Sequence, residues 1–230
     1  MTATELANYI EILRGEFQLE GSEKIAREQK AYMRNQFAYF GMRAEERRVV
    51  QKPFLIKAYL PPKSDLHQIV QGLWIQEERD FVHFAMELAF KYNKRWEKKD
   101  IQLFEFMVVH KSWWDSIDYI ATKLMGSYFK KFQEQRADSV QKWLDSGNFW
   151  LQRCALLFQL KYKEEIDTEL LSHAIKYLLG SKEFFINKAI GWVLREYSKT
   201  NPTWVVAFVE DNEDALNNLS KSEALRLLKR

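Results

Sequence analysis

The segment Lys111-Ser112-Trp113-Trp114-Asp115-Ser116-Ile117-Asp118 opens a stretch with helical spacing of apolar residues, and its pattern returns later in the chain. Aromatic residues stand near the starts of two further helical stretches: Trp150 follows Trp113 by 37 residues, and Phe185 follows Trp150 by 35. Each of the three stretches comes after a shorter helical one. Helix pairs repeated at such spacing are typical of solenoids. The sequence therefore predicts a repeat protein built from stacked helix pairs.

The rest of the chain extends this pattern and predicts an all-α fold. Four prolines and eight glycines lie between apolar periodic segments, as helix punctuation does, and no stretch alternates at period two. We expect an α-α superhelix, a solenoid of HEAT-like repeats, whose curvature gives a concave face able to follow a rod-like partner. The expected helices cover residues 22–36, 44–60, 64–74, 77–92, 98–110, 112–125, 137–145, 148–162, 167–179, 182–199 and 202–210.

Length and composition are compatible with one extended domain, which we expect to span residues 1–230. The chain is 47% hydrophobic and 29% charged, so it has both core material and a solvated surface. Cys154 is the only cysteine, which excludes an intrachain disulfide. Because neither a secretory segment nor a bilayer-spanning run is evident, we expect a cytoplasmic protein with no membrane contact. A net charge of +3 is too small to indicate a partner.

Several classes of chemistry find no support in the sequence. His67, His83, His110 and His173 show no close metal-ligand pairing, and one cysteine does not complete a familiar zinc site. Gly-rich phosphate loops and a Gly-x-Ser-x-Gly elbow are absent. We therefore expect no metal and no cofactor.

The most distinctive candidate site combines indoles with a carboxylate. Trp114 and Asp118 are four residues apart and share one face of a helix. An aromatic face and an anion both attract positive charge, so the pair suits a cationic, sugar-like species. A tryptophan on a helix is more often core, however, and Asp115 or Asp118 near a helix start is more often a surface or capping residue. The residues alone leave both interpretations open.

Several segments together resemble the AlkD family of HEAT-like DNA alkylation-repair glycosylases. The resemblance covers nearly the whole chain, with a weaker echo at residues 31–34 and 41–48. Its strongest part lies between Lys111 and Pro202, in residues 111–118, 148–153, 158–163, 181–185 and 191–197. It implies a concave DNA-binding face and an enzyme that removes cationic bases such as 3-methyladenine and 7-methylguanine from duplex DNA.

The resemblance also implies roles for individual residues. The catalytic positions fall on Asp118, Trp114 and Trp192, with Arg153 beside them. Asp118 would stabilise the oxocarbenium-like deoxyribose and orient a water, while the two indoles flank the sugar. Residues expected to contact DNA are Arg153, Arg195, Lys111, Lys161, Lys182, Tyr32 and Arg43. The family usually has proline where this chain has Glu45, whose negative charge would repel phosphate nearby.

The expected partner is duplex DNA containing alkylated bases, bound by a monomer. The resemblance implies that the lesion stays largely stacked while its deoxyribose touches the aromatic shelf, so bulky adducts would be tolerated. Base removal without lyase activity is expected. The alternative is a non-catalytic HEAT-like scaffold that binds DNA structures or a protein, because an architecture does not specify an activity.

Overall fold

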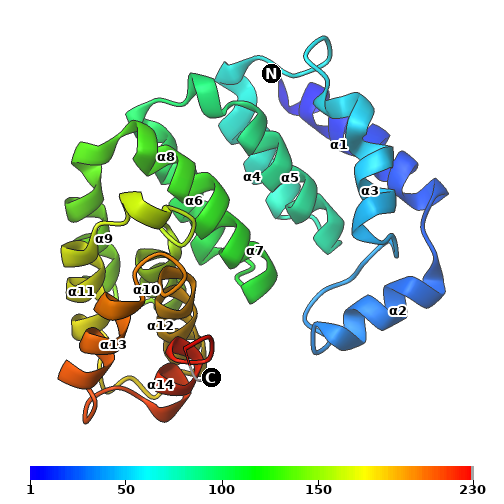
Figure 1. Ribbon diagram of the computed structural model, residues 1–230. Helices are drawn as coiled ribbons and strands as arrows, with labels where there is room; N and C mark the ends of the chain where they lie inside the picture. Colours follow the sequence, from blue (N-terminus) through cyan, green and yellow to red (C-terminus); the bar gives the residue numbers. More distant parts are fainter. Residues whose placement is uncertain (229–230) are drawn as a thin grey trace. The chain divides into compact units, whose positions relative to one another are not determined.

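The computed structural model describes residues 1–228, which form α-helices joined by short 3₁₀ turns (Figure 1). No strand occurs among these residues, apart from one isolated bridge between Ala38 and Glu78. The predicted all-α class is therefore confirmed. The chain divides into two compact units, Met1–Glu97 and a second that begins at Lys98. Within the described part, every helix is too short or too polar to cross a membrane.

The first unit packs its helices around a core of aromatic side chains. Phe17, Phe81 and Phe84 are fully buried, and their rings contact one another at centroid distances of 5.8 and 6.5 Å from Phe17. The first helix was not among the predicted ones; Thr2 and Glu5 form a capping box at its start. The elements of this unit are α1 (Ala3–Leu19), α2 (Glu23–Tyr32), α3 (Ala44–Gln51), η1 (Lys52–Leu55), η2 (Lys63–Asp65), α4 (Leu66–Trp74), α5 (Arg79–Lys91) and η3 (Asn93–Arg95).

The helix predicted over residues 44–60 is shorter than expected. α3 ends at Gln51 and gives way to the 3₁₀ turn η1, which contains Pro53. Proline has no backbone N–H and its ring clashes with the carbonyl of the preceding turn, so the α-helix does not continue. Residues 56–62 then form a loop that leads to η2.

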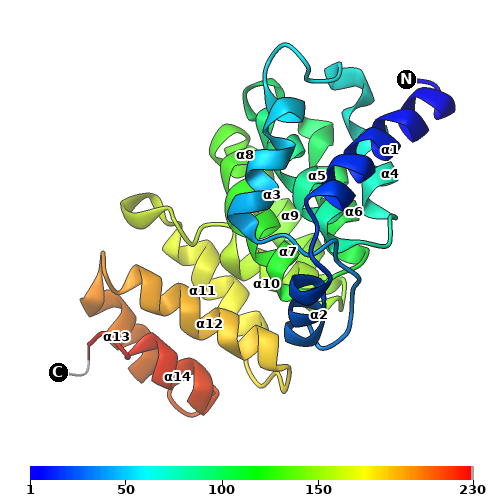
Figure 2. The ribbon, with the colours of Figure 1, turned by 90° about the vertical axis from the view of Figure 1, so that its right-hand side faces the viewer.

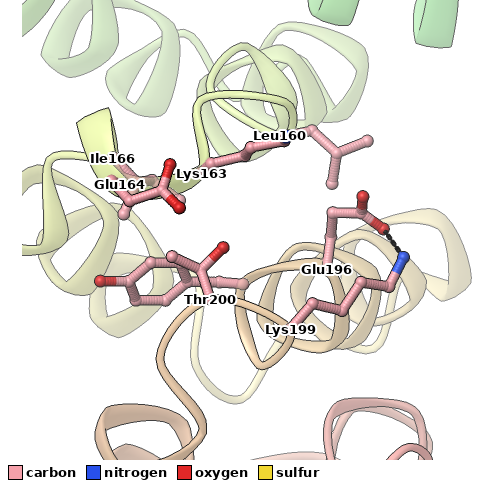
Figure 3. Close-up of a pocket in the computed structure, with 8 residues that line it drawn as sticks. Leu160, Lys163, Glu164, Ile166, Glu196, Lys199 and Thr200 are labelled. Atoms are coloured by element: carbon pink, nitrogen blue, oxygen red, sulfur yellow. Dashed lines mark hydrogen bonds and ion pairs between the residues drawn. The ribbon is translucent and has the colours of Figure 1, made fainter.

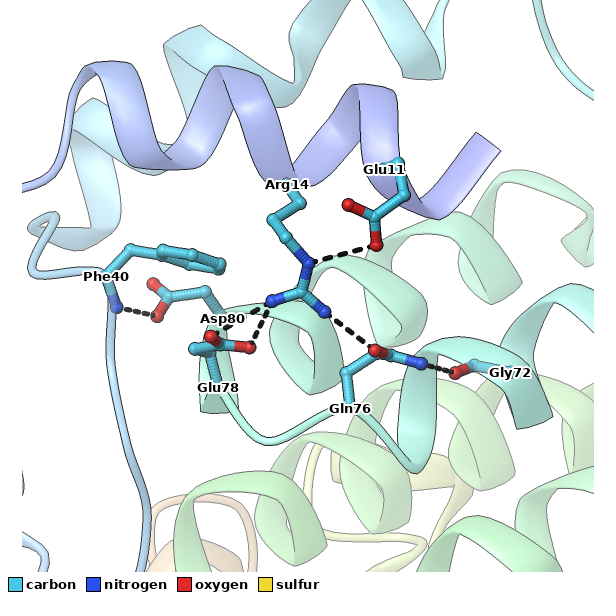
Figure 4. Close-up of polar contacts among 7 residues, drawn as sticks. All are labelled: Glu11, Arg14, Phe40, Gly72, Gln76, Glu78 and Asp80. Atoms are coloured by element: carbon cyan, nitrogen blue, oxygen red, sulfur yellow. Dashed lines mark hydrogen bonds and ion pairs between the residues drawn. The ribbon is translucent and has the colours of Figure 1, made fainter. Parts of the chain in front are cut away.

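Polar contacts join α1 to the turn between α4 and α5 (Figure 4). The guanidinium of Arg14 donates to both carboxylate oxygens of Glu78 at 2.9 and 3.0 Å, and to Gln76 at 2.7 Å. The backbone N–H of Phe40 donates to Oδ2 of the buried Asp80 at 3.0 Å. These contacts fix the start of α5 against the chain on either side of it.

The second unit repeats one helical motif. Its main helices α7, α10 and α12 begin at Trp114, Phe149 and Phe184, each 35 residues after the last. These helices are α7 (Trp114–Tyr119), α10 (Phe149–Leu157) and α12 (Phe184–Tyr197). The remaining elements are η4 (Lys98–Asp100), α6 (Ile101–Val109), the π-helix η5 (Ile120–Met125), α8 (Gly126–Lys131), η6 (Gln133–Gln135), α9 (Arg136–Asp145), η7 (Lys163–Glu165), α11 (Thr168–Tyr177), α13 (Pro202–Asp211) and α14 (Asn218–Ala224). The predicted repeat-like stacking of helices is therefore confirmed here.

Ion pairs follow the same period. Asp118 pairs with Arg153, Lys161 with Glu196, and Lys188 with Glu223, and in each pair the two residues are 35 positions apart. A separation of one repeat places the same helical position of neighbouring motifs side by side. Opposite charges one repeat apart therefore connect successive motifs.

Two glycines allow the repeats to approach closely. A Cβ on Gly126 would lie 2.6 Å from the backbone oxygen of Phe158, and one on Gly191 would lie 2.5 Å from Cβ of Glu223. The second contact brings α12 against α14, and Figure 2 shows these helices side by side. Only glycine fits such spacing without displacing the neighbouring chain.

Candidate active site

The predicted carboxylate Asp118 lies near the end of α7, just before a change in helix geometry. The residues that follow, Ile120–Met125, form a π-helix, and the hydroxyl of Thr122 donates to the Asp118 carbonyl at 2.6 Å. Single π-turns within helices occur frequently at functional sites. Lys111, just before α7, has a left-handed backbone with φ of +48°, which is uncommon for a residue with a side chain. Irregular backbone thus flanks the short helix that carries Trp114 and Asp118.

Arg153 on α10 holds the Asp118 carboxylate with two parallel hydrogen bonds. Its Nε donates to Oδ1 at 2.8 Å and its Nη2 donates to Oδ2 at 3.1 Å. The Arg153 side chain is only 4% exposed, whereas that of Asp118 is 21% exposed. A bidentate pair fixes the plane of the carboxylate as well as its position. Asp118 is therefore an oriented anion that solvent still reaches.

The same guanidinium also contacts α12. Nη1 of Arg153 donates to the backbone carbonyl of Phe185 at 2.5 Å. Arg153 thus links three successive main helices through one side chain. Trp192 is seven residues beyond Phe185, close to two helical turns, so it lies on a similar face of α12. Like Trp114, it is partly exposed.

Electrostatics at Asp118 reflect two opposing effects. Burial raises the pKa of the Asp118 carboxyl above its ordinary value, and repulsion from Asp115 raises it further. The charge and hydrogen bonds of Arg153 counteract part of this rise. A carboxylate with a raised pKa is a better proton acceptor than a fully solvated one. The neighbouring Cys154 is buried, which raises the pKa of its thiol, so it offers no thiolate nucleophile.

An aromatic cluster that the sequence did not single out as a site borders this ion pair. Trp113 contacts the rings of Trp150 and Phe185 at centroid distances of 6.3 and 5.8 Å, and Phe149 stacks parallel to Phe185. The indole N–H of Trp113 is buried without a hydrogen-bond acceptor. Trp150 is buried, whereas Trp113 is partly exposed. The cluster fixes the start of α12, where the Phe185 carbonyl meets Arg153.

The cations predicted to contact DNA differ in what surrounds them. Arg195 is bound to Glu223, which also pairs with Lys188. Lys161 pairs with Glu196 at 2.9 Å but is 63% exposed. Lys182 is exposed and forms no ion pair within residues 1–228, and Lys111 is partly buried. Their contact with phosphate stays a prediction, and Arg195 would have to share its guanidinium with a carboxylate.

Two predicted DNA contacts lie in the first unit. Tyr32, the last residue of α2, is 71% exposed. Arg43 precedes α3; its backbone N–H donates to Glu46 at 2.7 Å, and its side chain is exposed. Glu45 is also exposed in the first turn of α3. Contact of Tyr32 and Arg43 with DNA stays a prediction.

A pocket of about 250 Å³ in the second unit lies between the end of α12 and the turn η7 (Figure 3). It does not contain Asp118 or either candidate tryptophan. Its wall includes Glu196. Burial tends to raise the pKa of this carboxyl, but hydrogen bonds from Lys199 and Lys161 outweigh that effect and hold the pKa below its usual value. Because its charges neutralise one another, this pocket carries no clear chemistry. Among residues 1–228, moreover, no three His, Cys, Asp or Glu side chains gather to hold a metal.

The second unit is thus a helical repeat with an arginine-oriented carboxylate at the junction of three motifs. Comparison with known proteins extends this description. The chain belongs to the DNA alkylation repair enzyme family, whose sequence pattern it matches over residues 13–228. It is also similar to a solved structure described as "Predicted DNA alkylation repair enzyme from Enterococcus faecalis", with a TM-score of 0.85 and 34% identity over 92% of this chain and 98% of that one. No curated protein gives a significant match.

Membership of this family agrees with the resemblance to AlkD and indicates a DNA-binding repair enzyme. The sequence did not predict the hydrogen bond from Arg153 to the Phe185 carbonyl, the aromatic cluster around Trp113 or the bidentate ion pair between Asp118 and Arg153. A signal for that link exists in the sequence, because opposite charges stand one repeat apart at residues 118 and 153.

Proposed function

We propose that this protein is a DNA glycosylase that hydrolyses the N-glycosidic bond of cationic alkylated purines, 3-methyladenine and 7-methylguanine among them, in duplex DNA. The observation that carries the proposal is the Asp118 carboxylate, held by Arg153 with bonds of 2.8 and 3.1 Å and still open to solvent. Trp114 lies one helical turn before it. The family of the chain supports a role in alkylation repair.

The chemistry needs little beyond an anion and a dry aromatic surface. N-alkylation gives the purine a positive charge, so the electrons of the breaking glycosidic bond neutralise the base as it leaves. The sugar is left with oxocarbenium character at its anomeric carbon. Asp118 stabilises that charge electrostatically and accepts a proton from the water that forms the new bond to this carbon. Trp114 and Trp192 flank the sugar and exclude other solvent.

Arg153 is a positioning residue in this mechanism. Its side chain is 4% exposed, and three of its five N–H groups already point at Asp118 and the Phe185 carbonyl. It orients the carboxylate toward the anomeric carbon, and its charge and hydrogen bonds counteract the rise in the pKa of Asp118 that burial causes. Because a buried guanidinium reaches phosphate poorly, we expect its substitution to lower the excision rate more than DNA affinity.

Base release from methylated duplex DNA tests the proposal. We expect the purified protein to release 7-methylguanine and 3-methyladenine well above the spontaneous rate. Borohydride should trap no covalent complex, because the mechanism has no lysine nucleophile and hence no lyase step. DNA binding with no base release above background would instead identify a non-catalytic helical scaffold.

A further inference from the structure

The first unit contains a broad pocket that plays no part in the proposed chemistry. It has a volume of about 810 Å³ and lies between the loop that follows η1 and the end of α5. Leu55, Leu60 and two prolines supply its apolar wall. Its charged residues are Lys57, Lys91, Lys94 and Arg95.

The charge of this pocket is one-sided. Four cations line it and no acidic residue does. The segment 52–63 contains three lysines and no Asp or Glu, although the whole chain has 35 basic and 32 acidic residues. Cations gathered around a hollow repel one another, and an anion that enters relieves this repulsion. The pocket therefore favours a negatively charged ligand.

Three of the cations, Lys57, Lys91 and Arg95, are also available to such a ligand. Lys57 and Lys91 are exposed and form no ion pair with any of the described residues 1–228. The guanidinium of Arg95 lies over the ring of Tyr92 at 4.6 Å, and the Tyr92 hydroxyl donates to the Pro61 carbonyl at 2.5 Å. Stacking occupies the face of the guanidinium but leaves its N–H edge free. That edge can bind an oxyanion with two parallel hydrogen bonds.

The loop that carries Lys57 also exposes an aromatic residue, Tyr59, which lines a separate hollow with Tyr9, Pro53 and Phe54 rather than the pocket itself. Tyr59 is 71% exposed and Ile56 is 41% exposed, both on the loop that carries Lys57. Apolar side chains so exposed beside free lysines are typical of surfaces that bind nucleic acid, where phosphates meet cations and sugars or bases meet aromatic rings. A small inorganic anion would use the cations but not this loop.

We propose that this pocket binds the phosphodiester backbone of DNA, with Lys57, Lys91 and Arg95 as the phosphate contacts. The proposal rests on the proposed function only for the choice of DNA as the source of the phosphate. The site gives affinity without sequence preference, because backbone contacts carry no base information.

The experiment measures DNA affinity as a function of salt. Wild-type protein, the double variant Lys57→Gln/Lys91→Gln and the control Lys24→Gln/Lys176→Gln are titrated against a labelled duplex between about 50 and 200 mM salt. The control removes the same charge from exposed lysines outside the pocket that form no ion pair within residues 1–228. Each phosphate contact contributes about 0.9 to the slope of log affinity against log salt, or roughly a threefold change over this range.

We expect the slope to fall by about 1.8 in the pocket variant and to change little in the control. Lys57→Arg/Lys91→Arg should restore the wild-type slope, which separates lost charge from misfolding. Equal slopes in the pocket variant and the control would overturn the proposal. Titration with inorganic phosphate forms a second arm: loss of phosphate binding in the pocket variant with an unchanged DNA slope would assign the site to a free anion and overturn its assignment to DNA.

The outcomes also separate this proposal from the proposed function. The pocket variant should retain the wild-type excision rate once DNA is saturated with protein, since the pocket does not include Asp118. A reduced slope in a protein that releases no base would support the DNA contact and contradict the glycosylase. Normal base release with an unchanged slope would support the glycosylase and contradict the DNA contact at this pocket.

Discussion

Replacing Arg153 by methionine should expose how strongly the Asp118 carboxylate depends on its partner. Methionine retains much of the side-chain stem but removes both hydrogen bonds to the carboxylate and the one to the Phe185 carbonyl. Removing one member of a buried ion pair costs about 3–5 kcal/mol, because the other charge is left desolvated. Asp118 is 21% exposed, so water offsets part of this cost and we expect a loss of about 3 kcal/mol at pH 8.

The free energy of unfolding that is lost in Arg153→Met should be larger at high pH than at low pH. In the variant, burial and Asp115 still raise the pKa of Asp118, and the counteracting effect of Arg153 is gone. A carboxyl whose folded pKa lies above its unfolded pKa destabilises the fold when ionised. The penalty is therefore present at high pH, decreases as pH falls through the raised folded value, and vanishes below the unfolded value of 3.8.

Urea unfolding followed by circular dichroism at pH 8 and pH 5 measures this difference. The control is Arg136→Met, which removes a hydrogen bond from Nε to the Phe129 carbonyl and a contact with the Tyr162 ring but no ion pair with a carboxylate. It should cost about 1 kcal/mol at both pH values. The double variant Asp118→Asn/Arg153→Met should be more stable at pH 8 than Arg153→Met alone. A loss in Arg153→Met that is equal at both pH values, or no larger than that of the control, would refute the reasoning.

Three further substitutions or treatments test the packing of the second unit. Gly126→Ala places a Cβ 2.6 Å from the Phe158 oxygen and should lower the free energy of unfolding by about 1–3 kcal/mol; an unchanged urea midpoint would contradict this close approach. Asn148→Ala removes the acceptor for the N–H groups of Trp150 and Leu151, so thermal unfolding should show a loss of about 1 kcal/mol, and a neutral result would mean that water caps α10 equally well. The buried Cys154 should react with a thiol reagent only when the protein unfolds, and rapid labelling of native protein would show that α10 opens locally.

Sequence patterns predicted the helices and the repeat because these depend on local periodicity. α7, α10 and α12 begin within two residues of the predicted starts at 112, 148 and 182. The end of α3 was misjudged because the helical pattern continues past Pro53, although the backbone does not. α1, α8 and α14 were not predicted, although Thr2 and Glu5 at the start of α1 form a recognisable capping signal.

The site was harder to predict because it depends on contacts between motifs. Helical spacing placed Trp114 and Asp118 on one face, and the family resemblance brought in Trp192 and Arg153. Neither could show that Arg153 turns inward to Asp118 and to a backbone carbonyl on α12, since that depends on how three helices align. The phosphate role predicted for Arg195 likewise gave no hint of its ion pair with Glu223.

Single-turnover excision of 7-methylguanine by wild type, Asp118→Asn and Asp115→Asn tests whether Asp118 is the catalytic carboxylate. Asparagine preserves the shape of the side chain and removes its charge. With enzyme in excess over methylated duplex, Asp118→Asn should bind DNA normally and excise about a hundredfold more slowly, as expected when one preorganised electrostatic partner of a transition state is lost. Asp115→Asn should remain close to wild type. Full activity in Asp118→Asn, with loss of activity in Asp115→Asn, would show that the carboxylate held by Arg153 is not the group that stabilises the departing sugar.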